Sequence, residues 1–140
     1  MVAIADEQKT LRLPEARVRR LVRRLIGTRS LSIAFVTNAV IRKINRKYLG
    51  HDFATDVLSF PLGSSPSGAP REVFGELVIS AEYAASEAKA RGIPVDEELL
   101  RYVAHGVLHL LGYDDHDPKS KARMWKRQER EVRKVMGPRP

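Results

Sequence analysis

Segments with the apolar spacing of an α-helix alternate along this chain with short apolar runs, and this alternation limits the folds that the chain can adopt. The helical segments are bounded by capping residues, prolines and glycines. The expected helices lie between Pro14 and Gly27, from Thr37 or Asn38 to Gly50, from Ser80 to about Arg91, from Pro94 to Gly112 and from Pro118 to about Met136. The expected strands are Leu31–Val36, Val57–Phe60 and Phe74–Ile79, and residues 62–72, rich in Gly, Ser and Pro, are expected to form an exposed loop.

This element order, α-β-α-β-β-α-α-α, predicts one domain over residues 1–140, since neither a linker nor an internal repeat interrupts it. Helices and strands in such an order bury their apolar faces by covering a small sheet with helices. We therefore predict an α+β fold of the small α/β type, in which about five helices cover a mixed sheet of three to four strands. The second helix is expected to bury Val40, Ile41, Ile44 and Tyr48.

The composition excludes several functional classes. Cysteine is absent, so disulfides and thiolate metal sites are impossible, and any metal must be held by nitrogen or oxygen ligands. No apolar run approaches the ~20 residues needed to span a bilayer, and residues 1–20 lack the apolar core of a secretory signal. We therefore expect a soluble, cytoplasmic protein without a membrane partner. The net charge of +8 favours a polyanion such as RNA, although an aromatic content of 6% offers no platform for stacking several bases.

Three of the four histidines fall within one segment of twelve residues, 105–116. His105 and His109 are four residues apart on an expected helix, so their rings lie on the same face. Gly112 follows where the helix ends and can adopt a positive φ, which turns the chain back toward the histidines. Asp115 or His116 would then supply a third ligand and leave a position open for water or substrate. The segment predicts a divalent metal site at the end of a central helix.

Paired histidines at this spacing also occur in zinc proteases, which carry a glutamate directly after the first histidine as the general base. Here that position is Gly106, which has no side chain to accept a proton. The nearest carboxylates, Asp114 and Asp115, follow the expected helix. Peptide hydrolysis is therefore disfavoured on chemical grounds.

The segment HGVLHLLGYDD, residues 105–115, resembles the histidine motif of the YbeY family of metal-dependent endoribonucleases. Residues 45–48 together with 55–61 resemble the central segment of that family, and residues 75–80 resemble its third-strand signature. The resemblance implies a hydrolase that cleaves single-stranded RNA endonucleolytically, with one divalent ion, zinc, as cofactor. It further implies a role in 3' end maturation of 16S ribosomal RNA and in ribosome quality control. The implied partners are single-stranded RNA and the small ribosomal subunit, and DNA is not expected.

The chain departs from the family motif at the third metal ligand. The family has a histidine ten residues after the first, where this chain has Asp115, and His116 follows one residue later. Spacing favours Asp115, whereas the ligands usual for a cysteine-free zinc site favour His116. An aspartate ligand would make the site more anionic and better suited to harder ions such as Mn²⁺ or Mg²⁺. Both residues are retained as candidates for the third ligand.

A second departure concerns the phosphate-binding arginine that the family commonly has after its Asn-x-x-Tyr segment. Here that position is Leu49, which cannot bind phosphate. Arg46 is the first candidate to replace it as a catalytic and substrate-binding residue, with Lys47 and His51 as alternatives. Ser59 is a further candidate for substrate binding, because its hydroxyl can donate a hydrogen bond to phosphate.

An alternative function is that of a ribosome-associated RNA-binding assembly factor in which the metal is structural. The last expected helix favours it, because basic residues recur along its length. They are Lys119, Lys121, Arg123, Lys126, Arg127, Arg130, Arg133 and Lys134. The two functions differ in whether removal of the metal abolishes RNA cleavage or leaves only RNA binding to be measured.

Overall fold

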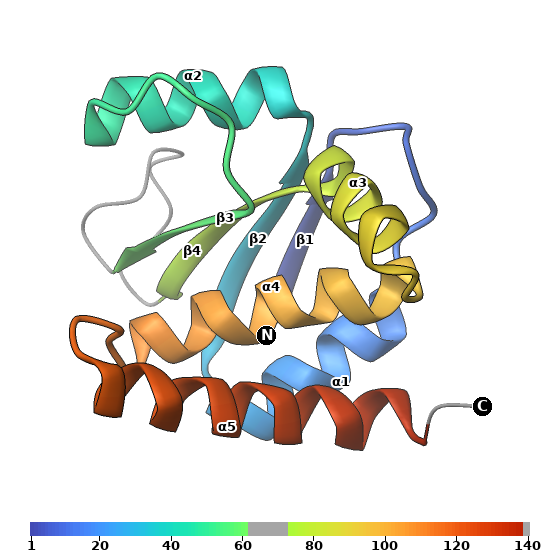
Figure 1. Ribbon diagram of the computed structural model, residues 1–140, viewed down its shortest axis with the longest axis vertical. Coiled ribbons are helices and arrows are strands. Elements are labelled where there is room, and N and C mark those ends of the chain that lie inside the picture. Colours follow the sequence, from blue (N-terminus) through green and yellow to red (C-terminus); the bar gives the residue numbers. More distant parts are fainter. Residues whose placement is uncertain (62–72, 139–140) are drawn as a thin grey trace.

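A mixed sheet of four strands forms the centre of the computed structural model, which describes residues 1–61 and 73–138 (Figure 1). The loop expected at residues 62–72 lies outside the described residues. In chain order the elements are β1 Val2–Asp6, α1 Glu15–Ile26, β2 Ser30–Val36, α2 Asn38–Leu49, β3 Val57–Pro61, β4 Val73–Ser80, α3 Ala81–Arg91, α4 Val95–Leu110 and α5 Pro118–Met136. The α+β class and the five expected helices are confirmed.

The strands lie in the order β1-β2-β4-β3. β1 pairs with β2 in parallel, with Ile4 opposite Ile33. β2 pairs in parallel with β4, which places Ile33 opposite Leu77. β3 runs antiparallel to β4 and places Ser59 opposite Leu77. The sheet is therefore mixed, and α4, which carries the functional segment, contacts the two neighbouring strands β3 and β4.

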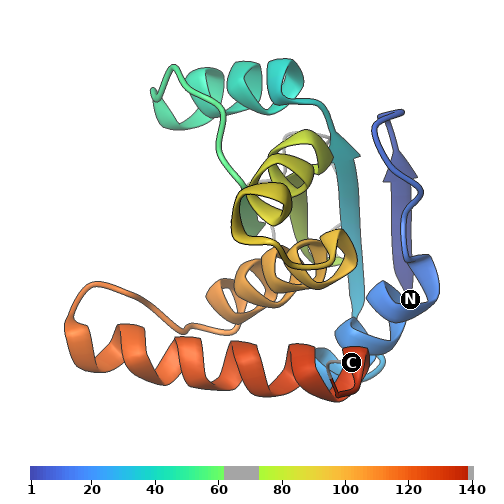
Figure 2. The ribbon, with the colours of Figure 1, turned by 45° about the vertical axis from the view of Figure 1, so that its right-hand side comes forward.

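Helices cover both faces of this sheet, because successive strand residues point to opposite faces. On one face, Ile33 and Leu77 join a core that includes α1, α4 and α5. On the other face, Val36 and Val78 pack with Ile41 of α2. Figure 2 shows α2 apart from the group formed by α1, α4 and α5. The larger core thus lies under α4, the helix that carries both candidate metal-binding histidines.

The first strand was not predicted from the sequence. The predicted element order began with a helix and is wrong there, because the structure begins with the strand β1. β1, Val2–Asp6, is an edge strand in which only alternate residues are partly buried. Its backbone is held by parallel pairing with β2, whose paired residues lie 29 positions later in the chain. Such pairing leaves little signal in a five-residue segment, because the partner and not the local pattern determines the conformation.

The buried face of α2 also differs from the predicted one at its carboxyl end. Ile41 is fully buried, as expected, but Tyr48 is 42% exposed and contacts the Phe60 ring only edge-on, at 5.9 Å between centroids. Asn45 is buried in its place, and its Nδ2 donates a hydrogen bond to the Phe53 carbonyl at 3.0 Å. The polar Asn45 is thus buried because it binds the backbone of the segment that follows the helix.

Two glycines allow α4 to lie close to the sheet. A Cβ atom built on Gly106 would lie 2.8 Å from Leu77 Cδ2 and 3.1 Å from Val57 Cγ2. A Cβ atom on Gly75 would lie 2.7 Å from Leu110 Cδ1. Packing therefore favours glycine at position 106, and a glutamate there would have to displace the Leu77 and Val57 side chains of the sheet. The argument against a glutamate general base next to His105 thus gains a steric reason.

The last helix, α5, packs against α4 and α1 rather than against the strands (Figure 2). It begins at Pro118 and is capped by Asp117, whose Oδ1 accepts a hydrogen bond from the Ser120 backbone N–H at 2.8 Å. Met124 and Val132 are buried against the neighbouring helices. Of the helices that the structure describes, none has the length and apolar character needed to cross a bilayer.

Candidate metal centre

The two histidines of α4 converge at the carboxyl-terminal half of the helix. His105 Nε2 and His109 Nε2 are 3.1 Å apart, and both side chains are half-buried. The carboxylate of Asp115 joins them, so that one ligand atom from each of the three residues lies within 4.8 Å of the other two. The structure thus brings together three of the residues that the sequence had indicated as metal ligands.

The turn after α4 returns the aspartate to the histidines. Gly112 adopts a φ of +98°, a conformation that L side chains rarely adopt. The next backbone N–H, that of Tyr113, donates to the Leu108 carbonyl at 3.0 Å and closes the helix end. Among the residues that the structure describes, His116 is not part of the three-residue group. The geometry therefore favours Asp115 over His116 as the candidate third ligand.

This donor set suits a divalent ion. Ligand atoms about 2.0–2.2 Å from a tetrahedral ion lie roughly 3.3 Å apart, close to the 3.1 Å between the two imidazole nitrogens. Burial, followed by the proximity of His105, lowers the pKa of His109, and the neutral imidazole is the form that binds metal. Asp115 is exposed, which leaves its carboxylate free to approach the pair. The residues present therefore fit the metal that the family resemblance implies.

A buried glutamine on α5, which the sequence analysis did not identify, holds the first histidine. Gln128 is 2% exposed, and its Oε1 lies 2.8 Å from His105 Nδ1. Its Nε2 donates to Glu129 Oε2 at 3.0 Å. Glu129 in turn accepts two hydrogen bonds from Arg101, each 2.7 Å long, and the bond to Glu129 raises the pKa of Arg101. A chain of hydrogen bonds thus runs from Arg101 to the candidate metal ligand.

This series of hydrogen bonds determines which nitrogen of the His105 ring carries the proton. An ionised Glu129 can only accept, so the Gln128 amide must direct its NH₂ group toward Glu129 and its oxygen toward His105. The His105 Nδ1 must then carry the proton, which leaves the Nε2 lone pair directed toward His109 and available to a metal. Metal-binding histidines ordinarily use such a partner to set their tautomer and orientation. Gln128 is therefore a positioning residue for the candidate metal centre.

Replacing Gln128 by leucine is expected to lower the affinity for divalent metal by about 10- to 100-fold, because His105 loses the acceptor that fixes its tautomer. Isothermal titration of metal-free protein with Zn²⁺ would measure the change. The matched control is Gln8→Leu, which also removes a buried glutamine, one that donates to Asp6 Oδ1 at 2.8 Å. Equal metal affinity in the two variants would contradict the role assigned to Gln128.

In the part of the chain that the structure describes, neither of the two candidate substrate-binding residues has a hydrogen bond or ion pair with the three grouped residues. Arg46 is on the exposed side of α2, with its Nη1 3.9 Å from Asp52 Oδ1. Ser59 of β3 is half-buried and donates its hydroxyl hydrogen to the Gly106 carbonyl at 3.1 Å, which ties the strand to α4. Their roles in binding substrate stay predictions. Leu49, at the position of the family arginine, is 50% exposed.

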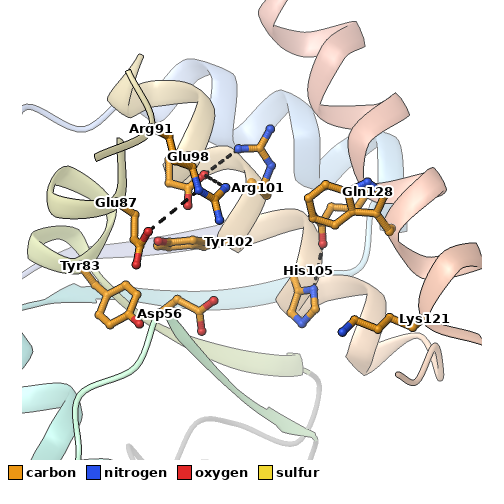
Figure 3. Close-up of a pocket in the computed structure, with 11 residues that line it drawn as sticks. Asp56, Tyr83, Glu87, Arg91, Glu98, Arg101, Tyr102, His105, Lys121 and Gln128 are labelled. Carbon is orange, nitrogen blue, oxygen red and sulfur yellow. Dashed lines mark hydrogen bonds and ion pairs between the residues drawn. The ribbon is translucent and has the colours of Figure 1, made fainter. Parts of the chain in front are cut away.

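Two cavities meet at His105. The first, the polar cavity, has a volume of about 300 Å³ and contains charged groups from α3, α4 and α5, among them Arg91, Glu98 and Lys121. Figure 3 shows His105 on α4 and Lys121 on α5 at the same side of this cavity. The second, the apolar cavity, has a volume of about 350 Å³ and extends from His105 and Asp115 along α5. Neither Arg46 nor Ser59 is among the residues lining these two cavities.

Fold and site together define a small α+β protein with a candidate metal centre of two histidines and one aspartate beside open cavities. The family model described as Endoribonuclease YbeY matches residues 3–136. The chain therefore belongs to the Endoribonuclease YbeY family, and the resemblance read from the histidine motif is confirmed.

Curated relatives and a solved structure agree with this assignment. A protein from Geobacter sulfurreducens named Endoribonuclease YbeY is 35% identical over 138 residues, which cover 94% of this chain and 92% of the relative. One from Anaeromyxobacter sp. is 46% identical over 107 residues, covering 76% of this chain but only 54% of the relative. This chain thus spans about half the length of that relative. The solution structure of TM1509 from Thermotoga maritima aligns with a TM-score of 0.70 at 30% identity, covering 98% of this chain and 90% of the other.

Proposed function

We propose that this protein is a metal-dependent endoribonuclease that hydrolyses phosphodiester bonds in single-stranded RNA. The observation that carries the proposal is the group formed by His105, His109 and Asp115, in which His105 lines both the polar and the apolar cavity. Membership of a family named for endoribonuclease activity supports the reaction class. A single-stranded substrate is favoured because a flexible strand can bend into a cavity beside the site, whereas a duplex cannot.

The three grouped residues would hold one divalent ion, and we propose zinc. When bound, the ion supplies Lewis-acid polarisation of the phosphodiester and activation of water. Gln128 keeps the His105 ring oriented for this task. Lys121 lines both cavities and offers a positive charge to the phosphate groups of the strand. The net charge of +8 draws the polyanion to the surface from a distance.

The biological substrate that we propose is the precursor of 16S ribosomal RNA, at its 3' end, with a further role in ribosome quality control. The small ribosomal subunit would be the partner, and the cytoplasm, where ribosomes assemble, would be the location. The likeness of residues 105–115 to the family's histidine motif supports this proposal. The basic surface supports it as well, because phosphate contacts supply much of the affinity for RNA.

Removal of the metal is the direct test. Protein loaded with Zn²⁺ is expected to cleave a single-stranded RNA, and treatment with a chelator is expected to reduce cleavage to background while RNA binding changes by less than about 3-fold, since phosphate contacts by Lys and Arg do not need the ion. Gel electrophoresis of labelled RNA would follow cleavage, and fluorescence anisotropy would follow binding. Cleavage that persists after chelation and is unchanged by added metal would contradict the proposal.

The second candidate function, an RNA-binding assembly factor with a structural metal, is favoured by the exposed basic residues of α5. Part of that surface is already engaged within the protein, since Arg127 donates to the Tyr113 hydroxyl at 2.9 Å and Arg133 pairs with Glu97. The same experiment separates the two functions. A structural metal predicts that chelation lowers the thermal stability of the protein and that no cleavage accompanies the metal-loaded state.

A further inference from the structure

The single tryptophan of the chain, Trp125, lies on the surface next to the candidate metal centre. It is 53% exposed, although a tryptophan in a chain of this size is ordinarily a major part of the core. Trp125 lines both the polar and the apolar cavity, and so does His105. An exposed indole that shares two cavities with a candidate metal ligand requires a reason other than packing.

The apolar cavity has the volume and the lining of a site for a small, partly apolar group. Its volume of about 350 Å³ lies within the range of small-molecule sites. Ala122, Met124 and Trp125 of α5 line this cavity, and so do His105 and Asp115 of the candidate metal centre. A group seated in this cavity would therefore be next to whatever is bound at the metal.

A fixed positive charge lies over the indole ring. The Arg101 guanidinium carbon lies 5.9 Å from the centroid of the Trp125 ring, a distance at which a cation attracts the ring. Arg101 is 7% exposed and is bound by Glu98 at 2.6 Å as well as by Glu129 at 2.7 Å. The guanidinium cannot move without breaking these bonds, so it restrains the indole from within the protein while the ring remains accessible from the solvent.

A cation accompanies the indole on the same face of α5. Lys121 precedes Trp125 by four residues, which places the two side chains one helical turn apart on one face. Lys121 also lines both cavities, whereas the neighbouring Lys126 lines neither. An aromatic ring and a positive charge thus lie side by side next to the candidate metal site. Such a pair can bind a nucleotide, because the ring stacks with the base and the charge attracts the phosphate.

We infer that the apolar cavity is a base subsite, in which Trp125 stacks with a nucleobase adjacent to the scissile phosphate while Lys121 contacts the neighbouring phosphate. This inference rests on the proposed function and names the subsite that holds the strand. Every nucleobase has a π-face, so the subsite accepts any base and gives the enzyme little sequence preference. It also explains why a strand must be unpaired to bind, because a base within a duplex is stacked on its neighbours and cannot enter the cavity.

The single tryptophan makes the subsite directly observable. Metal-free protein, which does not cleave, is titrated with a short single-stranded oligouridylate while tryptophan emission is recorded. Stacking is expected to produce a saturable loss of emission with the same midpoint as the binding curve from anisotropy of the labelled oligonucleotide. The same titration with an RNA duplex is expected to leave the emission unchanged. Binding of the single strand without any change in emission would overturn the inference.

Two substitutions test whether the ring itself is needed. Trp125→Phe retains an aromatic face, and Trp125→Leu retains only apolar volume. Leucine is expected to raise the Kd for the oligouridylate by about 10-fold, and phenylalanine by less, since stacking of one base contributes on this scale. Lys121→Ala is expected to weaken binding and to reduce its salt dependence, and Lys126→Ala is the matched control of equal charge on the same helix. Equal affinities for the leucine and phenylalanine variants would contradict stacking.

An oligonucleotide with one abasic position separates this inference from the proposed function. Moving the abasic position along the strand is expected to reveal one site at which it weakens binding of the wild-type protein but not of Trp125→Leu. If metal-dependent cleavage is measured but every abasic position weakens both proteins equally, the base subsite is rejected and the nuclease function stands. If sedimentation instead shows that the wild type is a dimer and that Trp125→Leu is a monomer, the indole serves self-association and the inference is rejected.

Discussion

Replacing both His105 and His109 by alanine is expected to reduce metal-dependent RNA cleavage by at least about 1,000-fold, because the substitution removes two of the three grouped ligand atoms and with them the activation of water. A steady-state cleavage assay with a labelled single-stranded RNA would measure the loss. Binding of that RNA by the metal-free proteins is expected to be unchanged, since the Lys and Arg side chains that contact phosphate groups remain. The loss should therefore fall on kcat rather than on the Kd.

Two controls are needed to interpret this result. The two side chains are half-buried, so circular dichroism and the thermal midpoint must show that the double variant remains folded. The cleavage must also be due to the protein itself. Equal cleavage by the double variant and the wild type would identify a contaminating nuclease and reject the catalytic role. A variant that binds Zn²⁺ as tightly as the wild type would show that the ion is held elsewhere.

The elements that could be predicted from the sequence are those whose own residues determine them. α1 and α4 carry apolar residues at helical spacing and end near a proline, a glycine or both, so their bounds were predicted to within a few residues. The histidine pair could be predicted for the same reason, because a spacing of four on a helix fixes the relative position of two side chains before anything else is known.

The features that were missed depend on partners distant in the sequence. β1 is a strand because β2 pairs with it, and its own five residues show only a weak alternation. Gln128 contacts His105 across 23 positions of the chain, and nothing near Gln128 in the sequence marks it as the partner of a metal ligand. Trp125 could be counted in the sequence, but its exposure beside the metal centre follows from how α5 packs on α4.

The third ligand lies between these two cases. Spacing and residue type gave opposite answers for Asp115 and His116, and the sequence alone could not choose between them. Among the described residues, the segment after the turn at Gly112, closed by the hydrogen bond from Tyr113 to Leu108, contributes Asp115 and not His116 to the histidine group. Asp115 joins the group, whereas the His116 backbone N–H donates to Asp114 Oδ1 at 3.3 Å as the chain turns away toward α5.

Asp115→Ala is accordingly expected to lower the affinity for divalent metal by more than about 100-fold, since the loss of a ligand exceeds the 10- to 100-fold effect of losing a residue that only orients one. His116→Ala is the matched control and is expected to change the affinity by less than about 3-fold, because its side chain lies outside the group. Titration calorimetry of metal-free protein with Zn²⁺ and Mn²⁺ would measure both. The reverse order of effects would make His116 the third ligand.

A third variant, Asp115→His, tests what the aspartate does for metal choice. It restores the histidine that the YbeY motif has at this position and exchanges a carboxylate oxygen for an imidazole nitrogen. Nitrogen ligands suit zinc, whereas carboxylate oxygens suit harder ions such as Mn²⁺. We expect the variant to bind Zn²⁺ at least as tightly as the wild type and to lose affinity for Mn²⁺. Because the substitution leaves the number of ligands unchanged, unchanged affinities for both ions would mean that Asp115 does not contact the ion.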